Sequence, residues 1–158
     1  MNDDSMRNRM QRLLRERRWA ALATSDVAGT PMASMVGYVM GNDNRVIYLH
    51  LSRLAAHTGN LLANGKAALV ISENDAEHGD PQELARVTLQ GHVSVVARDS
   101  DEYRCARDRY LERLPASERL FEFPDFILFR LDVEQARFVG GFAQARSFSA
   151  AELCAAAP

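Results

Sequence analysis

The residues best suited to chemistry lie together in one stretch, from Ser52 to Leu61. This stretch joins an apolar, strand-like run to the start of a predicted helix. It therefore offers free backbone N–H groups and the positive end of a helix dipole, which suit a phosphate. Ser52, Arg53, His57 and Thr58 add hydroxyl and cationic donors. A helix N-cap at Ser52 and a surface position for His57 explain the same residues without a ligand.

Most other kinds of catalytic or metal site are not expected. The sequence contains no GxxxxGK[ST], GxGxxG, HExxH or GxSxG motif. The four histidines are His50, His57, His78 and His92. None of them is spaced i, i+4 from another, so no helical zinc site is predicted. Acidic residues cluster in the loop at 75–80 without the spacing of an EF-hand. We interpret that loop as solvated and predict no metal.

Composition predicts one globular domain over residues 1–158, with an N-terminal helix within 1–18 and a short tail at 149–158. The net charge of −2 argues against nucleic acid as a partner of the whole molecule. The arginines between residues 7 and 18 are expected on the wet face of the first helix. No apolar run is long enough to cross a membrane, and no leader is recognised. Two distant cysteines, Cys105 and Cys154, suit a reducing compartment, which favours the cytoplasm.

Apolar spacing predicts the elements that position these residues. The 5–18 segment has helical spacing, and strands are predicted at 19–24, 32–40 and 46–51. A helix at 53–64, capped by Ser52, leads to a strand at 67–72. Residues 86–95 alternate clearly, with Gly91 as a bulge or close approach. A helix capped by Asp99 and Glu102 ends at Pro115.

Strands at 127–133 and 138–145 and a short tail helix at 149–152 complete the predicted order, which is α-βββ-α-β-β-α-ββ-α. The strands are short and are separated by turn signals instead of regular helical crossovers. This pattern favours a mainly β fold, an antiparallel β-barrel with flanking helices, over a doubly wound parallel sheet.

Four blocks in this order resemble the pyridoxamine 5′-phosphate oxidase-like superfamily of FMN-binding split β-barrels, and especially its branch of haem-utilisation proteins. Each block alone is moderately specific, whereas the ordered set covers most of residues 19–148. The blocks are GTPMASMV at 29–36, LSRLAAHTGNL at 51–61, DP at 80–81 with ARVTLQG at 85–91, and DF at 125–126 with ARFVGGFAQA at 136–145.

The resemblance implies a six-stranded split barrel that forms a homodimer, with FMN held between the subunits. Ser34, His57 and Arg86 fall where the oxidase contacts FMN, although the residue types differ from those of the oxidase. The remaining cofactor-facing positions implied by the family are Met35 and Val36 beside Ser34 at the isoalloxazine, Ser52 and Asn60 on the phosphate side, and Phe138 and Arg146 from the partner subunit.

The haem-degrading branch implies an axial histidine in the C-terminal tail, but no histidine follows His92 in this sequence. Haem ligation would then fall to His50, His57 or His92. The resemblance also leaves a deazaflavin open as the cofactor.

Three functions follow as hypotheses. The main one is an FMN-binding flavoprotein, an oxidoreductase with a small-molecule substrate other than that of the oxidase, in which the flavin carries the redox chemistry. No residue is required as a catalytic acid or base. The alternatives are a haem-binding or haem-degrading protein of the same fold, and a flavin-binding module without catalysis.

Overall fold

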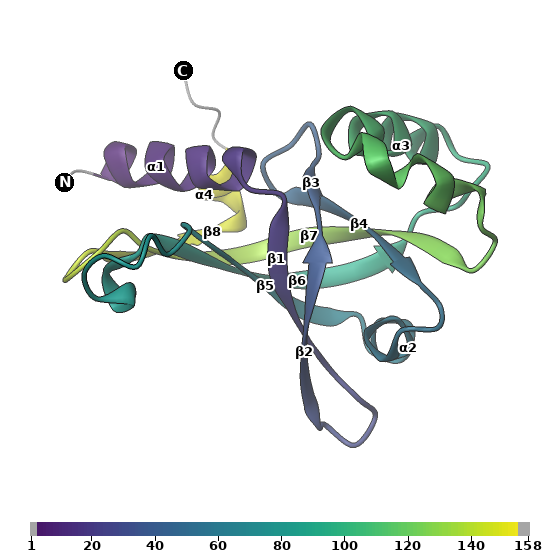
Figure 1. Ribbon diagram of the computed structural model, residues 1–158, viewed down its shortest axis with the longest axis horizontal. Coiled ribbons are helices and arrows are strands. Elements are labelled where there is room, and N and C mark those ends of the chain that lie inside the picture. The colour runs from purple at the N-terminus through teal and green to yellow at the C-terminus, as the bar shows by residue number, and fades with distance from the viewer. Residues whose placement is uncertain (1–2, 155–158) are drawn as a thin grey trace.

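The chain forms one antiparallel sheet of eight strands that curls into a barrel (Figure 1). The structure, a computed structural model, describes residues 3–154. The strands are β1 (Trp19–Ser25), β2 (Pro31–Gly37), β3 (Val39–Met40), β4 (Val46–Ser52), β5 (Lys66–Ser72), β6 (Arg86–Val95), β7 (Phe126–Val139) and β8 (Ala145–Ser149). Their order is β2-β1-β5-β6-β7-β4-β3, and β8 pairs with the second half of β7. The predicted mainly β fold with flanking helices is confirmed.

The sheet curls because its first and last strands are neighbours in the sequence. β2 lies at one edge and β3 at the other, and Tyr38 alone separates them. Tyr38 is buried, its backbone N–H donates to the Arg18 carbonyl, and its hydroxyl donates to the Leu14 carbonyl over 2.8 Å. Because one residue has to connect both edges, the sheet cannot stay open and flat.

Helices flank the barrel. The helices are α1 (Asp3–Glu16), α2 (Ala56–Ala63), α3 (Asp101–Arg113) and α4 (Ala150–Cys154), with short 3₁₀ segments η1 (Pro81–Glu83) and η2 (Pro115–Glu122). α1 buries the apolar face that its helical spacing predicts, whereas α2 and α4 each insert one leucine. These buried side chains, which join the strand residues of the main core, are Met6, Met10, Leu13, Leu14, Leu61 and Leu153.

A second apolar cluster lies on the outer face of the sheet, where α3 and η2 cover β4 and β7. His50 of β4 points into this cluster and is 6% exposed. Its ring stacks on Phe121 at 3.7 Å between centroids, with Tyr110 and Phe126 at its edges. Neither ring nitrogen has a hydrogen-bond partner among residues 3–154. Burial, with a smaller contribution from the positive charge of Arg98, lowers the pKa of His50 to about 4.

The structure corrects several local predictions. Ser52 does not cap α2: the N-cap is Ala55, without a side-chain cap, because the Ser52 hydroxyl donates to Asp125. Ser100, not Asp99, caps α3, by accepting the Tyr103 N–H. The predicted strand at 32–40 is divided at Tyr38 into β2 and β3. The two strands predicted at 127–133 and 138–145 are instead one long β7 followed by β8, which starts at Ala145. Of the predicted tail, residues 155–158 lie outside the described range.

Replacing Gly91 with alanine should destabilise the protein, because the bulge at Gln90 and Gly91 brings β6 against the β7 backbone. A Cβ at Gly91 would collide with the carbonyl of Asp132, which cannot rotate away. We expect Gly91→Ala to lower the free energy of unfolding by about 2 kcal/mol in urea denaturation. Gly59→Ala is the matched control, since a Cβ in that helix meets nothing within 4 Å. Equal stability of both variants would contradict this packing.

His50 should make the stability depend on pH. Its pKa is about 4 in the folded chain against an ordinary value of 6.5, so the unfolded chain takes up the proton first as the pH falls. The free energy of unfolding should therefore decrease between these two pH values, by about 3 kcal/mol at most. His50→Phe should flatten this decrease when urea midpoints are compared at about pH 7 and about pH 5. His78→Gln, on an exposed loop, should keep the wild-type dependence; an unchanged slope in His50→Phe would refute the assignment.

Candidate functional site

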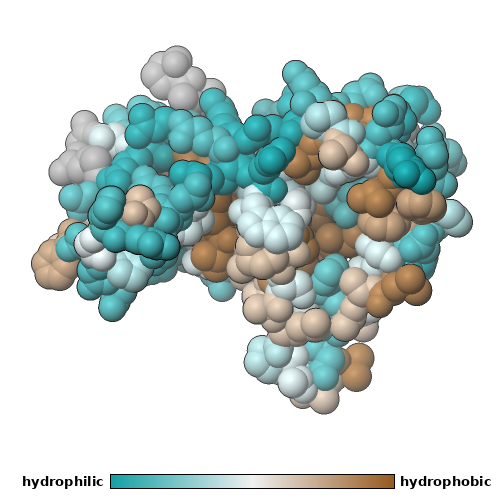
Figure 2. Space-filling model, in the orientation of Figure 1, coloured by the Kyte–Doolittle hydropathy of each residue, from teal (hydrophilic) through white to brown (hydrophobic). Residues whose placement is uncertain are grey.

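The outer face of the sheet is covered only in part. α3 and η2 lie over β4 and β7, whereas the outward-facing side chains of β1, β2 and β5 stay open. In the open part, Ala21 of β1 is the cross-strand partner of Met35 on β2 and of Val70 on β5. Trp19 lies two residues before Ala21 on β1 and therefore points to the same face. Trp19, Met35 and Val70 are 59%, 50% and 36% exposed. Apolar and intermediate surface accordingly gathers over β1 and β2, in contrast to the hydrophilic surface of α1 (Figure 2). We call these four residues the open apolar face.

A hollow of about 610 Å³ lies on the same side of the sheet, where β1, β5, β6 and β7 meet. Its floor includes Ala23 and Ala68, cross-strand partners whose small side chains leave the sheet accessible. Lys66 and His92 are cross-strand partners at its rim and are both exposed. An imidazole and an ammonium group therefore stand next to each other beside an apolar floor.

A second hollow of about 600 Å³ borders the open apolar face where α1 runs into β1. Trp19, Met35 and Val70 line it together with Arg17 and Arg18. Glu16, Glu73 and Asp75 line the same hollow, so its rim carries both signs of charge around an apolar surface.

The junction of β4 and α2 is tied to a distant carboxylate. The Ser52 hydroxyl donates to Asp125 Oδ2 over 3.0 Å and accepts the Leu54 N–H. The Arg53 N–H donates to the Asp125 carbonyl, and the Arg53 side chain is exposed. An uncapped helix N-terminus and one arginine favour an anion here, but the carboxylate beside Ser52 opposes one.

His57 and Asn60 of α2 face different surroundings. The Asn60 side chain donates to Thr24 Oγ1 over 3.0 Å, which fixes α2 against β1 beside the 610 Å³ hollow. His57 is half-buried in the first turn of α2, and this burial lowers its pKa. His57 is therefore a neutral ring at neutral pH.

The three consecutive candidates of β2 do not share a face. Ser34 and Val36 are paired with Leu22 and Ala20, which are buried inside the barrel, whereas Met35 points outward. Strand alternation makes this unavoidable. Of the three side chains, that of Met35 alone belongs to the open apolar face, and the others could reach a ligand there only through their backbone.

Arg86, Phe138 and Arg146 lie at the other end of the sheet from α2. Arg86 donates to the carbonyls of Gln82 and Leu84, which shapes the preceding loop. Phe138 is fully buried in the core of its own subunit. Arg146 pairs with Glu152 at 2.9 Å, and its guanidinium lies 4.8 Å from the centroid of the Phe148 ring. Within one chain, the structure does not bring these residues to Ser52, His57 and Asn60.

Sequence reasoning missed Trp19, Val70, Lys66 and the Ala23–Ala68 floor. The available signal was that 19–24 and 67–72 are apolar at nearly every position, and not only at alternate ones. Such strands bury both faces, so an outer face left open by the helices marks a surface for a ligand or a second chain. Within residues 3–154, no group of three or more histidine, cysteine, aspartate or glutamate side chains could hold a metal. The described helices are also too short or too polar to cross a membrane.

Comparison with known proteins agrees with the four sequence blocks. The family model described as pyridoxamine 5′-phosphate oxidase matches residues 6–140. Haem oxygenase HutZ of Vibrio cholerae is 32% identical over 139 residues, which are 87% of this chain and 78% of HutZ. The chloroplastic haem oxygenase HOZ of Arabidopsis thaliana is 34% identical over 74% of this chain, which spans 34% of HOZ.

The structure also resembles solved split barrels. A haem-binding protein of Mycobacterium smegmatis superposes on 98% of this chain with a TM-score of 0.85 and 28% identity. The chain spans 61% of that protein's length. The resemblance to the superfamily inferred from the sequence is therefore confirmed, and the chain belongs to the pyridoxamine 5′-phosphate oxidase-like split-barrel family.

Proposed function

We propose that this protein binds haem on the open side of its sheet and degrades it oxidatively. The observation that carries the proposal is the 32% identity to a haem oxygenase over 87% of the chain. The sequence alone favoured FMN as the cofactor and placed haem second; the comparisons support the opposite order. The residues present on the open side of the sheet also suit haem better than FMN.

The residues of the open side fit haem. The Ala23–Ala68 floor and the open apolar face suit a flat, apolar macrocycle. His92 presents an exposed imidazole to the 610 Å³ hollow, whereas the nitrogens of His50 are sealed under Phe121. We therefore assign iron ligation to His92, and the pairing of a propionate to Lys66, which lines the same hollow.

The junction of β4 and α2 fits the phosphate of FMN less well. Ser52, the expected phosphate-side hydroxyl, is already bonded to Asp125, and the carboxylate would repel a phosphate. Arg53 and the uncapped N-terminus of α2 are the groups that would compensate. A flavin-dependent oxidoreductase is the second candidate function, and the match to the oxidase family model is what favours it.

The roles of this chain's residues in haem degradation would be binding, orientation and exclusion of water. Bound haem would supply the redox-active iron and the oxidisable macrocycle. Trp19, Met35 and Val70 would cover one side of the ligand, and Lys66 would fix its orientation through an ion pair. No described side chain is required to move a proton.

A second copy of the chain would complete the site. Trp19, Met35 and Val70 together expose apolar surface, whose contact with water is unfavourable in free energy for a monomer. A two-fold partner laid on this face would bury that surface and enclose the hollows beside it. We therefore propose a homodimer with its cofactor between the subunits.

Haem binding is tested by titrating the purified protein with haemin and following the Soret absorbance. Wild type should saturate, and His92→Ala should shift the Soret maximum and weaken binding by about tenfold or more, because the iron loses its imidazole ligand. His57→Ala removes a half-buried histidine outside the hollow; it is the control and should bind as wild type. A protein that takes up FMN but shows no saturable Soret band would instead establish the flavin function.

The dimer is tested by light scattering at micromolar concentration. Wild type should have twice the 17.6 kDa mass of the chain. Met35→Asp should be monomeric, because the dimer would have to bury an unpaired carboxylate. Phe142→Asp, a substitution of an apolar residue that is 86% exposed in the turn between β7 and β8, should remain dimeric. A monomeric wild type, or dissociation by both substitutions, would count against this interface.

A further inference from the structure

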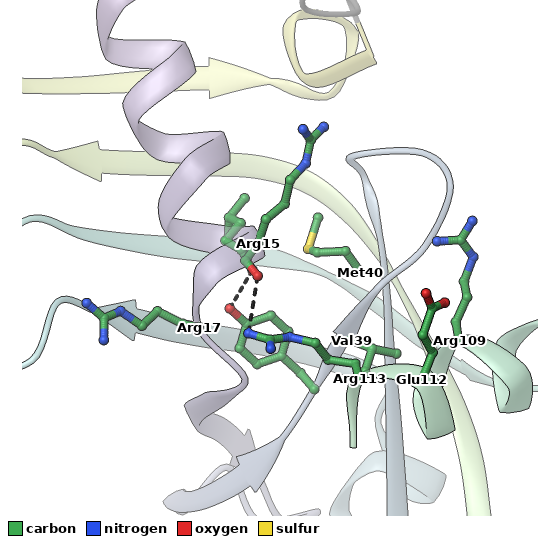
Figure 3. A pocket seen from close by; sticks show the side chains of 9 residues that line it. Arg15, Arg17, Val39, Met40, Arg109, Glu112 and Arg113 are labelled. Carbon is green, nitrogen blue, oxygen red and sulfur yellow. Dashed lines mark hydrogen bonds between the residues drawn. The ribbon is translucent and has the colours of Figure 1, made fainter. Parts of the chain in front are cut away.

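A separate hollow of about 330 Å³ lies between the C-terminal half of α1, β3 and α3, on the side of the molecule that α3 covers (Figure 3). Its floor is apolar and comes from Leu14, Tyr38, Val39 and Met40. Four arginines line it, one from the last turn of α1, one just after that helix and two from α3, and Glu112 is the one acidic residue among its lining residues. The arginines are Arg15, Arg17, Arg109 and Arg113.

Within residues 3–154, the charges of these four arginines are largely uncompensated, because Glu112 is the single carboxylate that lines the hollow. Among residues 3–154, none of the four guanidinium groups has a carboxylate within ion-pair distance. Arg15 donates to the neutral Asn44 side chain, and Arg113 donates to the carbonyls of Arg15 and Glu16. Arg109 makes no hydrogen bond to the described chain. Gathering four like charges is unfavourable without a counter-charge, and the chain as a whole has a net charge of −2.

The walls of the hollow are held in place before any ligand arrives. The buried Tyr38 hydroxyl donates to the Leu14 carbonyl over 2.8 Å, and Arg113 binds the last carbonyls of α1 over 2.7 and 3.3 Å. α1 and α3 are thereby locked to the Tyr38 connection between the sheet edges. A preformed cationic hollow loses little entropy when it binds an anion.

We propose that this hollow binds a small organic anion that carries two or more negative charges, as phosphate or carboxylate groups. The planar donors of Arg109 and Arg15 suit either group, because guanidinium binds both in bidentate fashion. Val39 and Met40 offer contact to the apolar part of the ligand. The proposal is independent of the haem site, because Lys66, His92 and the Ala23–Ala68 floor lie outside this hollow.

The test is isothermal titration calorimetry of the full chain without cofactor, using pyrophosphate and citrate as probes. We expect one saturable site per chain for at least one probe, and the tighter probe identifies phosphate or carboxylate as the preferred group. Arg109→Gln should weaken binding of that probe by about tenfold, the loss of one charge-assisted contact. Arg109 is the chosen position because its guanidinium makes no hydrogen bond or ion pair to residues 3–154, whereas Arg15 and Arg113 do make hydrogen bonds there.

Arg12→Gln is the matched control, because Arg12 lies on α1, the helix that supplies Arg15 to the hollow, but itself lines a different hollow. It removes the same charge from the molecule and should change the affinity by about twofold at most. Thermal unfolding confirms that both variants are folded. The proposal is overturned if neither probe shows saturable binding, or if Arg12→Gln weakens binding as much as Arg109→Gln.

Discussion

The arrangement of the whole chain depends on the one-residue connection at Tyr38. Because β2 and β3 are the two edges of one sheet and Tyr38 alone separates them, the sheet has to curl around its core. The buried hydroxyl then bonds to the Leu14 carbonyl, which places α1 over the end of the barrel. The curled sheet, the helix over its end and the cationic hollow between α1 and α3 all depend on this connection.

The curled sheet has an outer face with two different halves. Over β4 and β7, α3 and η2 bury His50 in an aromatic cluster that contributes to stability and leaves its nitrogens inaccessible. Over β1, β2 and β5 the face stays open, with apolar side chains, two hollows and the exposed pair Lys66 and His92. His50 is thus buried in the core, whereas His92 is exposed and accessible to a ligand. This division supports a haem site on the open half and a second copy of the chain as its cover.

Sequence patterns predicted the elements whose residues obey a simple period. α1 follows from the spacing of Met6, Met10, Leu13 and Leu14, and β6 from its alternation, including the bulge at Gly91. Sequence patterns gave wrong predictions where a contact with a residue far away in the sequence determines the local structure. Ser52 has the sequence of an N-cap, yet Asp125, far along the chain, binds its hydroxyl. The segment that forms η2 has no periodic pattern, so the sequence did not predict that Phe121 of η2 would cover His50. The resemblance to the family named Ser34 and Val36 together with Met35, although alternation turns two of these side chains into the barrel.

The central claim is that the open half of the sheet holds haem between two copies of the chain. Native mass spectrometry of the full chain, incubated with equimolar haemin and FMN, tests it most directly because it reports cofactor and assembly in one spectrum. The account predicts a dimer that carries haem and no flavin. A dimer that carries FMN in place of haem, or a monomer that holds haem alone, would contradict it.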